Sequence, residues 1–339
     1  MADMGQRIVR AALEEIEAEG SRYRLSLVLQ RLEESGGQDA CGERAMLYQS
    51  LEASGILVPL MARHFEGRLH LVDGFKRHAW ARKMGLSHME LMVLPEEADD
   101  LEIMLFLAQE HGALLSSVPA ARALYLSFCK GLGLSERALV RRIMPAVGLP
   151  PADRLLKKYL AVADLPEEAL AFAASKNLSF KRCLSLSSYP RPLLSWLMKR
   201  RGQLHLTASI CEEILDSLNE LMKRKDCTLQ ELLTEGGLEA ILEDPDQSVS
   251  RRTALFRKRL SGLRRPVSTA VNQELEALKR RAEGGHAPFE VAWDRSLEHE
   301  SIELRIAVTA PEQLDAALVR LSSGESRQAL LKMLDRLKG

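Results

Sequence analysis

The sequence has few aromatic residues and no excess of charge of either sign. Phe, Trp and Tyr make up 5% of its 339 residues, and 47 Lys and Arg residues balance 47 Asp and Glu residues. The overall charge therefore gives no indication of a nucleic-acid partner, so the distribution of charge along the chain has to be examined. The hydrophobic share of 46% is typical of a soluble protein with hydrophobic cores. At roughly 100–200 residues per domain, the length suits two or three domains.

Cysteines and long apolar runs are also scarce. The cysteines are odd in number and no pair has the spacing of metal ligands, so we expect free thiols in a reducing cytoplasm. The first ten residues lack an apolar core of signal-peptide length, and no run of about 18 apolar residues occurs. We therefore expect a cytoplasmic protein without a membrane span. Metal-ligand spacing of histidines and a Walker-type phosphate loop are absent as well. The five cysteines are Cys41, Cys129, Cys183, Cys211 and Cys227.

One stretch combines the features of an anion-binding turn. A short apolar run is followed by the turn signal Asp73-Gly74, and residues 76–84 favour a helix. Lys76 and Arg77 fall in its first turn. Free N–H groups and the positive end of the helix dipole lie at a helix N-terminus, so this stretch predicts a phosphate site. The alternative is an ordinary strand-to-helix turn with solvated cations.

The elements expected around this turn follow a recognisable order along the chain. A helix ends near Gly55-Ile-Leu-Val-Pro-Leu, strands at 56–63 and 68–72 follow, and a Gly-x-x-Arg box at Gly74 opens the next helix. This order resembles the N-terminal domain of ParB chromosome and plasmid partition proteins. The resemblance implies a small α/β domain that binds the triphosphate of CTP with Mg²⁺.

A second box of the same family lies at the end of the next long helix. Glu110 matches the family's Glu, which helps to complete the triphosphate and Mg²⁺ site, whereas His111 and Leu114 replace an Asn and an Arg. Phe75 replaces the Glu of the first box. A Leu cannot make the bidentate phosphate contact of an Arg. These departures favour an altered nucleotide site over a hydrolytic one. The residues expected to bind phosphate are Asp73, Gly74, Lys76, Arg77 and Glu110.

The middle of the chain predicts a helix-turn-helix. Short Gly and Pro turns separate expected helices at 120–129, 136–146 and 152–162. The family resemblance implies that the last two read DNA, with the second in the major groove. Basic residues three to four positions apart gather on or near one face of that second helix. The alternative is a helical bundle with solvated cations. The expected DNA-binding residues are Arg141, Arg142, Arg154, Lys157 and Lys158.

A strongly basic segment follows at 251–265. Asp and Glu are absent from residues 247–273. A helix of this charge would bind a phosphate backbone with a strong dependence on salt. The alternative is a solvated helix face between two domains. The basic residues assigned to DNA here are Arg251, Arg252, Arg257, Lys258, Arg259, Arg264 and Arg265.

Periodicity predicts the remaining elements and an α+β, predominantly helical fold. Alternation at 289–293 and 301–308 predicts a β-hairpin, which with its flanking helices is a candidate dimerisation module. We expect a ParB-like N-terminal α/β domain at 22–115, a helical domain with the helix-turn-helix at 117–243, and a C-terminal module at 251–339. Further expected elements are a helix at 4–19, a short strand at 22–27, a helix at 27–54 broken at Gly36-Gly37, a linker at 244–250, and helices at 98–110, 228–242, 251–283, 311–321 and 325–338.

Three hypotheses about function remain open at this point. The first is a divergent ParB-like DNA-binding protein, a dimer associated with the nucleoid, with a degenerate CTP-type site and a partition ATPase as a further partner. The second is a nucleotide-hydrolysing enzyme on the same fold, with Asp73 or Glu110 as the carboxylate near the metal. A third reading is a non-catalytic adaptor that binds no nucleotide.

Overall fold

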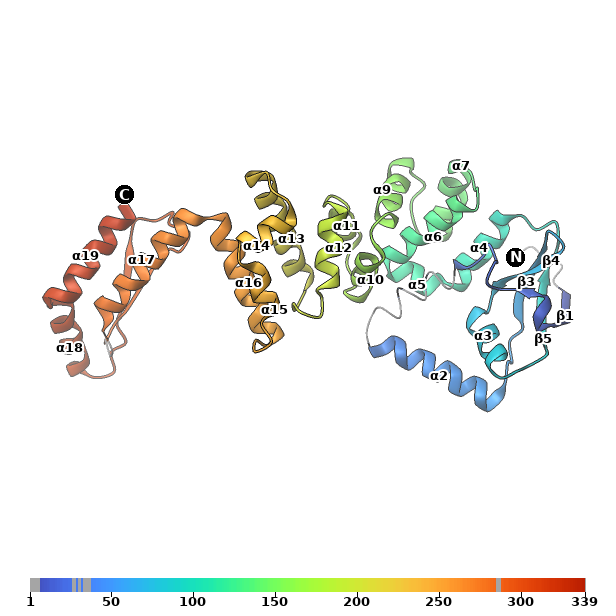
Figure 1. The fold of residues 1–339 in the computed structure, drawn as a ribbon, viewed down its shortest axis with the longest axis horizontal. Helices are drawn as coiled ribbons and strands as arrows, with labels where there is room; N and C mark the ends of the chain where they lie inside the picture. The colour runs from blue at the N-terminus through green and yellow to red at the C-terminus, as the bar shows by residue number, and fades with distance from the viewer. Residues whose placement is uncertain (1–6, 26–28, 30–31, 33–37, 285–287, 339) are drawn as a thin grey trace. The chain divides into compact units, whose positions relative to one another are not determined.

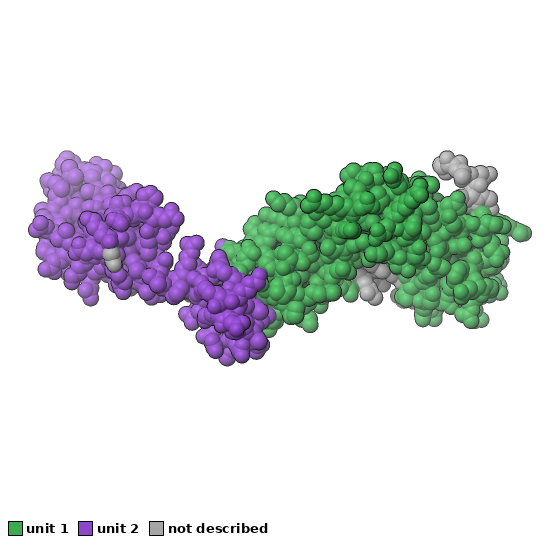
Figure 2. Space-filling view, turned by 90° about the horizontal axis from the view of Figure 1, so that it is seen from above, with its two compact units in different colours: residues 1–219 green, residues 220–339 purple. Residues whose placement is uncertain are grey.

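The structure, a computed structural model, describes residues 7–25, 29, 32, 38–284 and 288–338. It divides into two compact units, residues 1–219 and 220–339, which Figure 2 shows in green and purple. Helices predominate and the sheets are small, which confirms the predicted α+β, mostly helical class. The predicted domain boundaries near 116 and 247 stay a prediction. No helix in the described part of the chain is long and apolar enough to span a membrane.

The first unit begins with a five-stranded mixed sheet (Figure 1). Its strand order is β1-β5-β3-β4-β2, with β3 parallel to β5 and antiparallel to β4. Glu66 and Gly67 form the tight β3–β4 turn, and both have positive φ, as a two-residue hairpin of this twist requires. The strands are β1 Arg7–Ala12, β2 Ile16–Glu17, β3 Leu60–Phe65, β4 Arg68–Asp73 and β5 His88–Leu94.

Helix α3, Phe75–Lys83, covers the hydrophobic core of this sheet. Phe75 and Ala81 of the helix pack with Leu60, Leu71 and Leu91 of the central strands. Because these side chains are almost fully buried, the turn at Gly74 is fixed between a buried strand and a buried helix. Two more helices, α2 Gln38–Ser54 and α4 Asp100–Glu110, belong to this part of the chain.

The N-terminal segment differs from its prediction. The expected helix at 4–19 is wrong over the described residues, which form β1, a 3-10 turn η1 at Leu13–Glu15, and β2. β1 pairs with β5, some 80 residues later in the chain, and this long-range pairing overrides the helix-like apolar spacing. The expected strand at 22–27 is also wrong, because residues 22–24 form a turn. Its last two residues and the break expected at Gly36-Gly37 lie outside the described residues.

The rest of the first unit is helical, as predicted. A π-helical turn, η2, interrupts the predicted helix at 136–146. Pro145 has no N–H, so the carbonyl of Arg141 lacks the donor that an α-helix normally provides four residues later. The N–H of Met144 donates to the carbonyl of Leu139, five residues earlier, which is the pattern of a π-helix. The elements are α5 Gly112–Ser117, α6 Pro119–Gly131, α7 Glu136–Ala138, η2 Leu139–Ile143, α8 Met144–Ala146, α9 Asp153–Ala163, α10 Glu167–Ser175, α11 Phe180–Leu186 and α12 Arg191–Lys199.

Helix α13, Ala208–Lys225, crosses from the first unit into the second. Two long helices predicted beyond it are broken. The helix at 228–242 is divided at Gly236-Gly237, where Gly237 has φ +62°. The helix at 251–283 is divided at Arg265, because the residue before a Pro is pushed out of the helical region. The expected linker at 244–250 ends early, since Ser248 caps α16. The resulting helices are α14 Leu229–Glu235, α15 Leu238–Glu243, α16 Val249–Arg264 and α17 Pro266–Glu283.

The second unit ends in the predicted hairpin and its helices. β6, Glu290–Trp293, pairs antiparallel with β7, Ile302–Arg305, which confirms the hairpin. Leu275 of α17, Val291 of β6 and Met333 belong to one buried core. The last two helices are α18 Pro311–Ser322 and α19 Gly324–Lys338.

Candidate nucleic-acid interface

Gly74 adopts a conformation that other residues rarely reach. It precedes α3 with φ +94° and ψ 22°, in the left-handed region. A Cβ at this position would lie 2.8 Å from Cγ of Leu60, inside van der Waals contact. No side chain caps the helix N-terminus. The turn therefore has the glycine and the uncapped helix start that the sequence predicts for an anion site.

The Arg77 guanidinium is committed to the protein itself. Its Nη1 donates to the carbonyls of Val58 at 2.7 Å and Pro59 at 3.1 Å, and its Nη2 lies 3.2 Å from Oδ2 of Asp73. These bonds tie the segment before β3 to the turn after β4. Lys76 is not free either. A phosphate at this turn would thus meet backbone N–H groups without an available guanidinium.

The other predicted members of the phosphate site do not complete it. Phe75 is buried in the sheet core, with 5% of its surface exposed. Glu110 is an exposed residue at the end of α4, and no hydrogen bond or ion pair links it to the turn within the described residues. No three His, Cys, Asp or Glu side chains in the described ranges are grouped as metal ligands. These residues fit a triphosphate with Mg²⁺ poorly.

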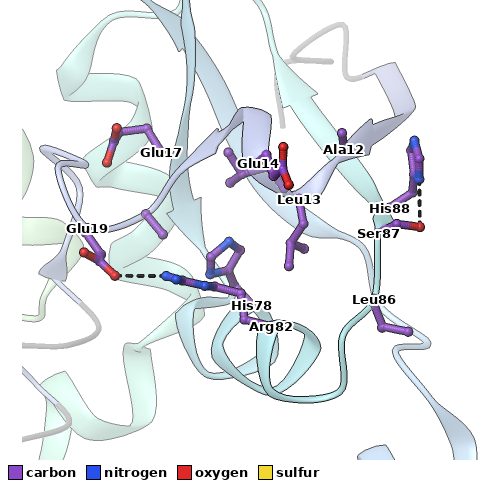
Figure 3. Close-up of a pocket in the computed structure, with 12 residues that line it drawn as sticks. Ala12, Leu13, Glu14, Glu17, Glu19, His78, Arg82, Leu86, Ser87 and His88 are labelled. Atoms are coloured by element: carbon purple, nitrogen blue, oxygen red, sulfur yellow. Dashed lines mark hydrogen bonds and ion pairs between the residues drawn. The ribbon is translucent and has the colours of Figure 1, made fainter.

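A cavity of about 750 Å³ is lined in part by His78 and Arg82 of α3 (Figure 3). It is formed by the segment from β1 to β2, the second half of α3 and the residues before β5, and none of the predicted phosphate residues lines it. Glu14, Glu17 and Glu19 face it, and Arg82 is paired with Glu19 at 2.9 Å. The backbone N–H of Gly20 lowers the pKa of Glu17. This acidic wall is unfavourable for a phosphate.

His78 also lines this cavity and carries no charge at neutral pH. Its side chain is buried, with 5% of its surface exposed, and burial lowers its pKa below the usual value. Arg82, one turn further along α3, lowers the pKa further. Neutral His78 therefore adds no positive charge to offset the carboxylates.

The residues predicted as a helix-turn-helix form α7, η2, α8 and α9, and their assignment to DNA stays a prediction. Ser135 caps the first helix by accepting from the N–H of Ala138 at 3.2 Å. Arg141 and Arg142 lie in the π turn and are exposed. A depression of about 340 Å³ is lined by these two side chains with Ser135, Arg137 and Ala138. Arg137 was not among the predicted residues, although its spacing of four from Arg141 is visible in the sequence.

Helix α9 presents its cations away from the core. Leu156 and Tyr159 are buried, whereas Arg154, Lys157 and Lys158 are exposed. From residue 137 to 163 the chain has six Lys and Arg residues and one acid, Asp153. None of the six cations makes an ion pair or a side-chain hydrogen bond within the described residues. A surface of this kind attracts a polyanion.

The basic residues of α16 fall into two groups. Arg252 donates to the carbonyls of Asp244 and Gln247, Arg259 donates to that of Gly236 at 2.6 Å, and Arg264 pairs with Glu220. These side chains hold the second unit together. Arg257 is half-buried and also engaged. The exposed cations without a partner among the described residues are Arg251 and Lys258 of α16, and Arg265 directly after it.

Comparison with known proteins gives structural likenesses only. No protein-family model matches the chain, and neither does any curated protein. The chain is similar to the C-terminally truncated chromosome-partitioning protein ParB of Caulobacter crescentus complexed to the centromeric parS site. That match has 16% identity and a TM-score of 0.29 over 61% of this chain and 98% of that chain.

Two further solved structures show the same kind of likeness. The Caulobacter crescentus ParB complexed with CTP-gamma-S has 16% identity and a TM-score of 0.21 over 57% of this chain and 99% of that chain. A pNOB8-like ParB N-domain has 13% identity and a TM-score of 0.33 over 80% of this chain and 98% of that chain. The structural neighbours are thus ParB partition proteins, at low identity. The functional argument rests on the residues of this chain.

Proposed function

We propose that this chain is a ParB-like protein that binds double-stranded DNA through its helix-turn-helix. The observation that carries the proposal is the set of six exposed, unpaired cations on α7, η2 and α9, against two acids, Glu136 and Asp153, in the same elements. A soluble protein gains no stability from unpaired cations of one sign at close range, because they repel each other. The phosphates of a duplex would offset this repulsion.

The geometry of the two helices suits a duplex groove. α9 and η2 both pack against α6, so the second helix is held at a fixed angle to the first. Ala152 is the N-cap residue of α9 and provides no side-chain cap, and Arg154 lies in the first turn of the helix. Residues at the N-terminal end of a recognition helix reach base edges, whereas cations further along contact phosphates. We therefore assign Arg154 to the groove and Lys157 and Lys158 to the backbone.

The wider role follows from the resemblance and belongs to the same proposal. It comprises a homodimer associated with the nucleoid, a function in chromosome or plasmid partition or in regulation, and a companion partition ATPase. In this proposal residues 22–115 form the ParB-like domain, 117–243 the DNA-binding domain and 251–339 the dimerisation module. No observation on the described residues favours the hydrolytic alternative.

CTP with Mg²⁺ is the finer part of the proposal. The uncapped start of α3 after Gly74 supports a phosphate at this turn, whereas the commitment of Arg77 argues against tight binding. We expect at most weak binding of CTP. Calorimetry of the intact protein with CTP, ATP, GTP and UTP in Mg²⁺ tests this. Tight, CTP-selective binding would contradict the weak site, and no binding of any triphosphate would remove the nucleotide from the proposal.

Charge removal on the helix-turn-helix tests the proposal directly. DNA affinity of the intact protein is measured by fluorescence anisotropy as a function of salt for the wild type and for a variant with Arg141, Arg142, Lys157 and Lys158 changed to Gln. The salt slope is the slope of log K against log salt, and each lost phosphate contact reduces its magnitude by about 0.9. The magnitude of the slope should therefore fall by about 3 to 4. The control variant Arg327→Gln/Lys332→Gln removes charge from α19 and should keep the wild-type slope. An unchanged slope in the helix-turn-helix variant would overturn the proposal.

A further inference from the structure

The helices that follow the helix-turn-helix carry a second concentration of positive charge. Between Glu168 and Glu212 the chain has no Asp or Glu but seven Lys and Arg residues. Some of these are held within the protein: Arg182 lies 3.8 Å from Glu212, and Arg200 lies over the ring of Trp196. Two lysines next to one turn, Lys176 and Lys181, are exposed and have no partner within the described residues.

That turn, from α10 to α11, is fixed by its backbone. Asn177 has φ +45°, and its N–H donates to the carbonyl of Ala174 at 3.0 Å. The N–H of Leu178 donates to the carbonyl of Ala173 at 2.9 Å, which completes a Schellman closure of α10. Leu178 is buried beneath the turn. Lys176 therefore projects from a rigid position.

Ser179 lies in the same turn and has an unused hydroxyl. It occupies the N-cap position of α11, yet its side chain makes no capping hydrogen bond. Ser135 and Ser248, at equivalent positions of other helices, both accept from a backbone N–H. Ser179 is exposed, and its Oγ makes no hydrogen bond to any described residue. A hydroxyl of this kind is a common partner of a phosphate oxygen.

An aromatic stack joins this turn to the helix-turn-helix. The rings of Phe180 and Tyr159 lie 4.1 Å apart at 19° to each other. Tyr159 directly follows Lys158 on α9, and Phe180 directly precedes Lys181 on α11. The stack therefore packs the start of α11 against the buried face of α9, with Lys158 and Lys181 each next in the chain to a stacked ring.

We infer that Lys176, Ser179 and Lys181 form a second phosphate-contact surface. It takes the sugar–phosphate backbone of the same duplex that the helix-turn-helix binds, and in this sense it rests on the proposed function. Two ammonium groups and one hydroxyl contact phosphate oxygens without reading bases. The surface therefore adds affinity equally on every sequence and fixes the orientation of α9 in its groove.

The test uses the intact protein and the variant Lys176→Gln/Lys181→Gln. The salt slope of duplex binding should fall by about 1.8, since each phosphate contact contributes about 0.9. The loss of affinity should be the same on two unrelated duplexes. Ser179→Ala should weaken binding without changing the slope, because it removes no charge. Arg182→Gln is the matched control: this residue is paired with Glu212, so its removal should leave the slope as in the wild type.

The outcomes separate this inference from the proposed function. The double-lysine variant could keep the wild-type salt slope of duplex binding while the helix-turn-helix variant shows a reduced one. That result would overturn the second surface alone. Loss of affinity on one duplex only would also overturn it, since that result indicates base reading. Failure of the wild type to bind any duplex would overturn both. Circular dichroism and thermal unfolding of each variant establish that exposed Gln side chains at 176 and 181 leave the fold intact.

Discussion

At the scale of single residues, the left-handed backbone of Gly74 makes a direct prediction about stability. Gly74→Ala places a Cβ at φ +94° and 2.8 Å from Leu60. The strain should lower the free energy of unfolding by about 1–3 kcal/mol. Chemical denaturation measures the change.

A second glycine serves as the control for this substitution. Gly112 begins α5 and has nothing within 4 Å of a built Cβ. Gly112→Ala should be neutral or slightly stabilising, because Ala favours a helix. Equal stability of the two variants would show that the turn before α3 is not strained in this way.

The buried thiols predict a pattern of chemical reactivity. Burial raises the pKa of Cys129 and Cys211 to about 12 and that of Cys183 to about 11. Because the thiolate is the nucleophile, these three residues should not react with a thiol reagent at pH 8 until the protein unfolds. Of the four cysteines whose side chains the structure describes, Cys227 is partly exposed and should react first.

The same shifts predict a loss of stability at alkaline pH. The folded protein keeps these thiols protonated where the unfolded chain, with an ordinary thiol pKa near 9, releases the protons. Stability is therefore full below about pH 9 and falls as the pH rises toward 11–12. Thermal unfolding from pH 8 to 11 measures this fall. Rapid labelling of all the cysteines in the native protein would contradict the burial.

At the scale of elements, α16 separates structural cations from those available to DNA. Arg259→Gln removes the bond to the carbonyl of Gly236 and should lower the free energy of unfolding by about 1 kcal/mol. Lys258→Gln, the adjacent exposed position, should leave stability unchanged and lower the salt slope of DNA binding by about 0.9. Chemical denaturation of the two variants gives the free energy of unfolding, and fluorescence anisotropy gives the salt slope of DNA binding. If Lys258→Gln keeps the wild-type slope, α16 lies outside the interface.

The elements also show what a sequence can predict. The β3–β4 hairpin and α3 were predicted to within a few residues, because their signals are local: a two-residue turn, a glycine and an apolar run. β1 was missed because its partner β5 is distant in sequence. The helix breaks at Gly236-Gly237 and before Pro266 also had local signals, which the apolar periodicity on either side outweighed.

The candidate site was predictable only in part, for the same reason. The cations of α9 are visible in the sequence because an amphipathic helix fixes which residues face solvent. The hydrogen bonds that Arg77 makes could not be predicted from the sequence, because only the fold brings the carbonyls of Val58 and Pro59 close to it. The available surface of α16 likewise depends on carbonyls that end other helices. The acid-free stretch from 169 to 211 is a sequence signal, yet the stacking of Phe180 on Tyr159 is what connects it to α9.

At the scale of the whole molecule, the second unit predicts self-association. Exposed apolar side chains gather on α18, where Leu314, Leu318 and Val319 have 43%, 54% and 70% of their surface exposed. Apolar surface of this kind is typical of an interface. We expect a dimer by light scattering after size-exclusion chromatography, and a monomer for Leu318→Glu/Val319→Glu. Lys332→Gln on α19 is a control that should remain dimeric, and a wild-type monomer would contradict the prediction.

The central claim, that the chain holds a duplex through its unpaired cations, is tested most directly by the salt dependence of DNA binding by the wild-type protein. Five of the six cations of the helix-turn-helix, all but Arg154 in the groove, predict a slope of log K against log salt of about −4.5, at about −0.9 per phosphate contact. Fluorescence anisotropy of a labelled duplex, measured at salt concentrations from roughly 50 to 300 mM, gives this slope. A steep slope of this size is the result we predict. No binding at low salt, or a slope near zero, would contradict the account.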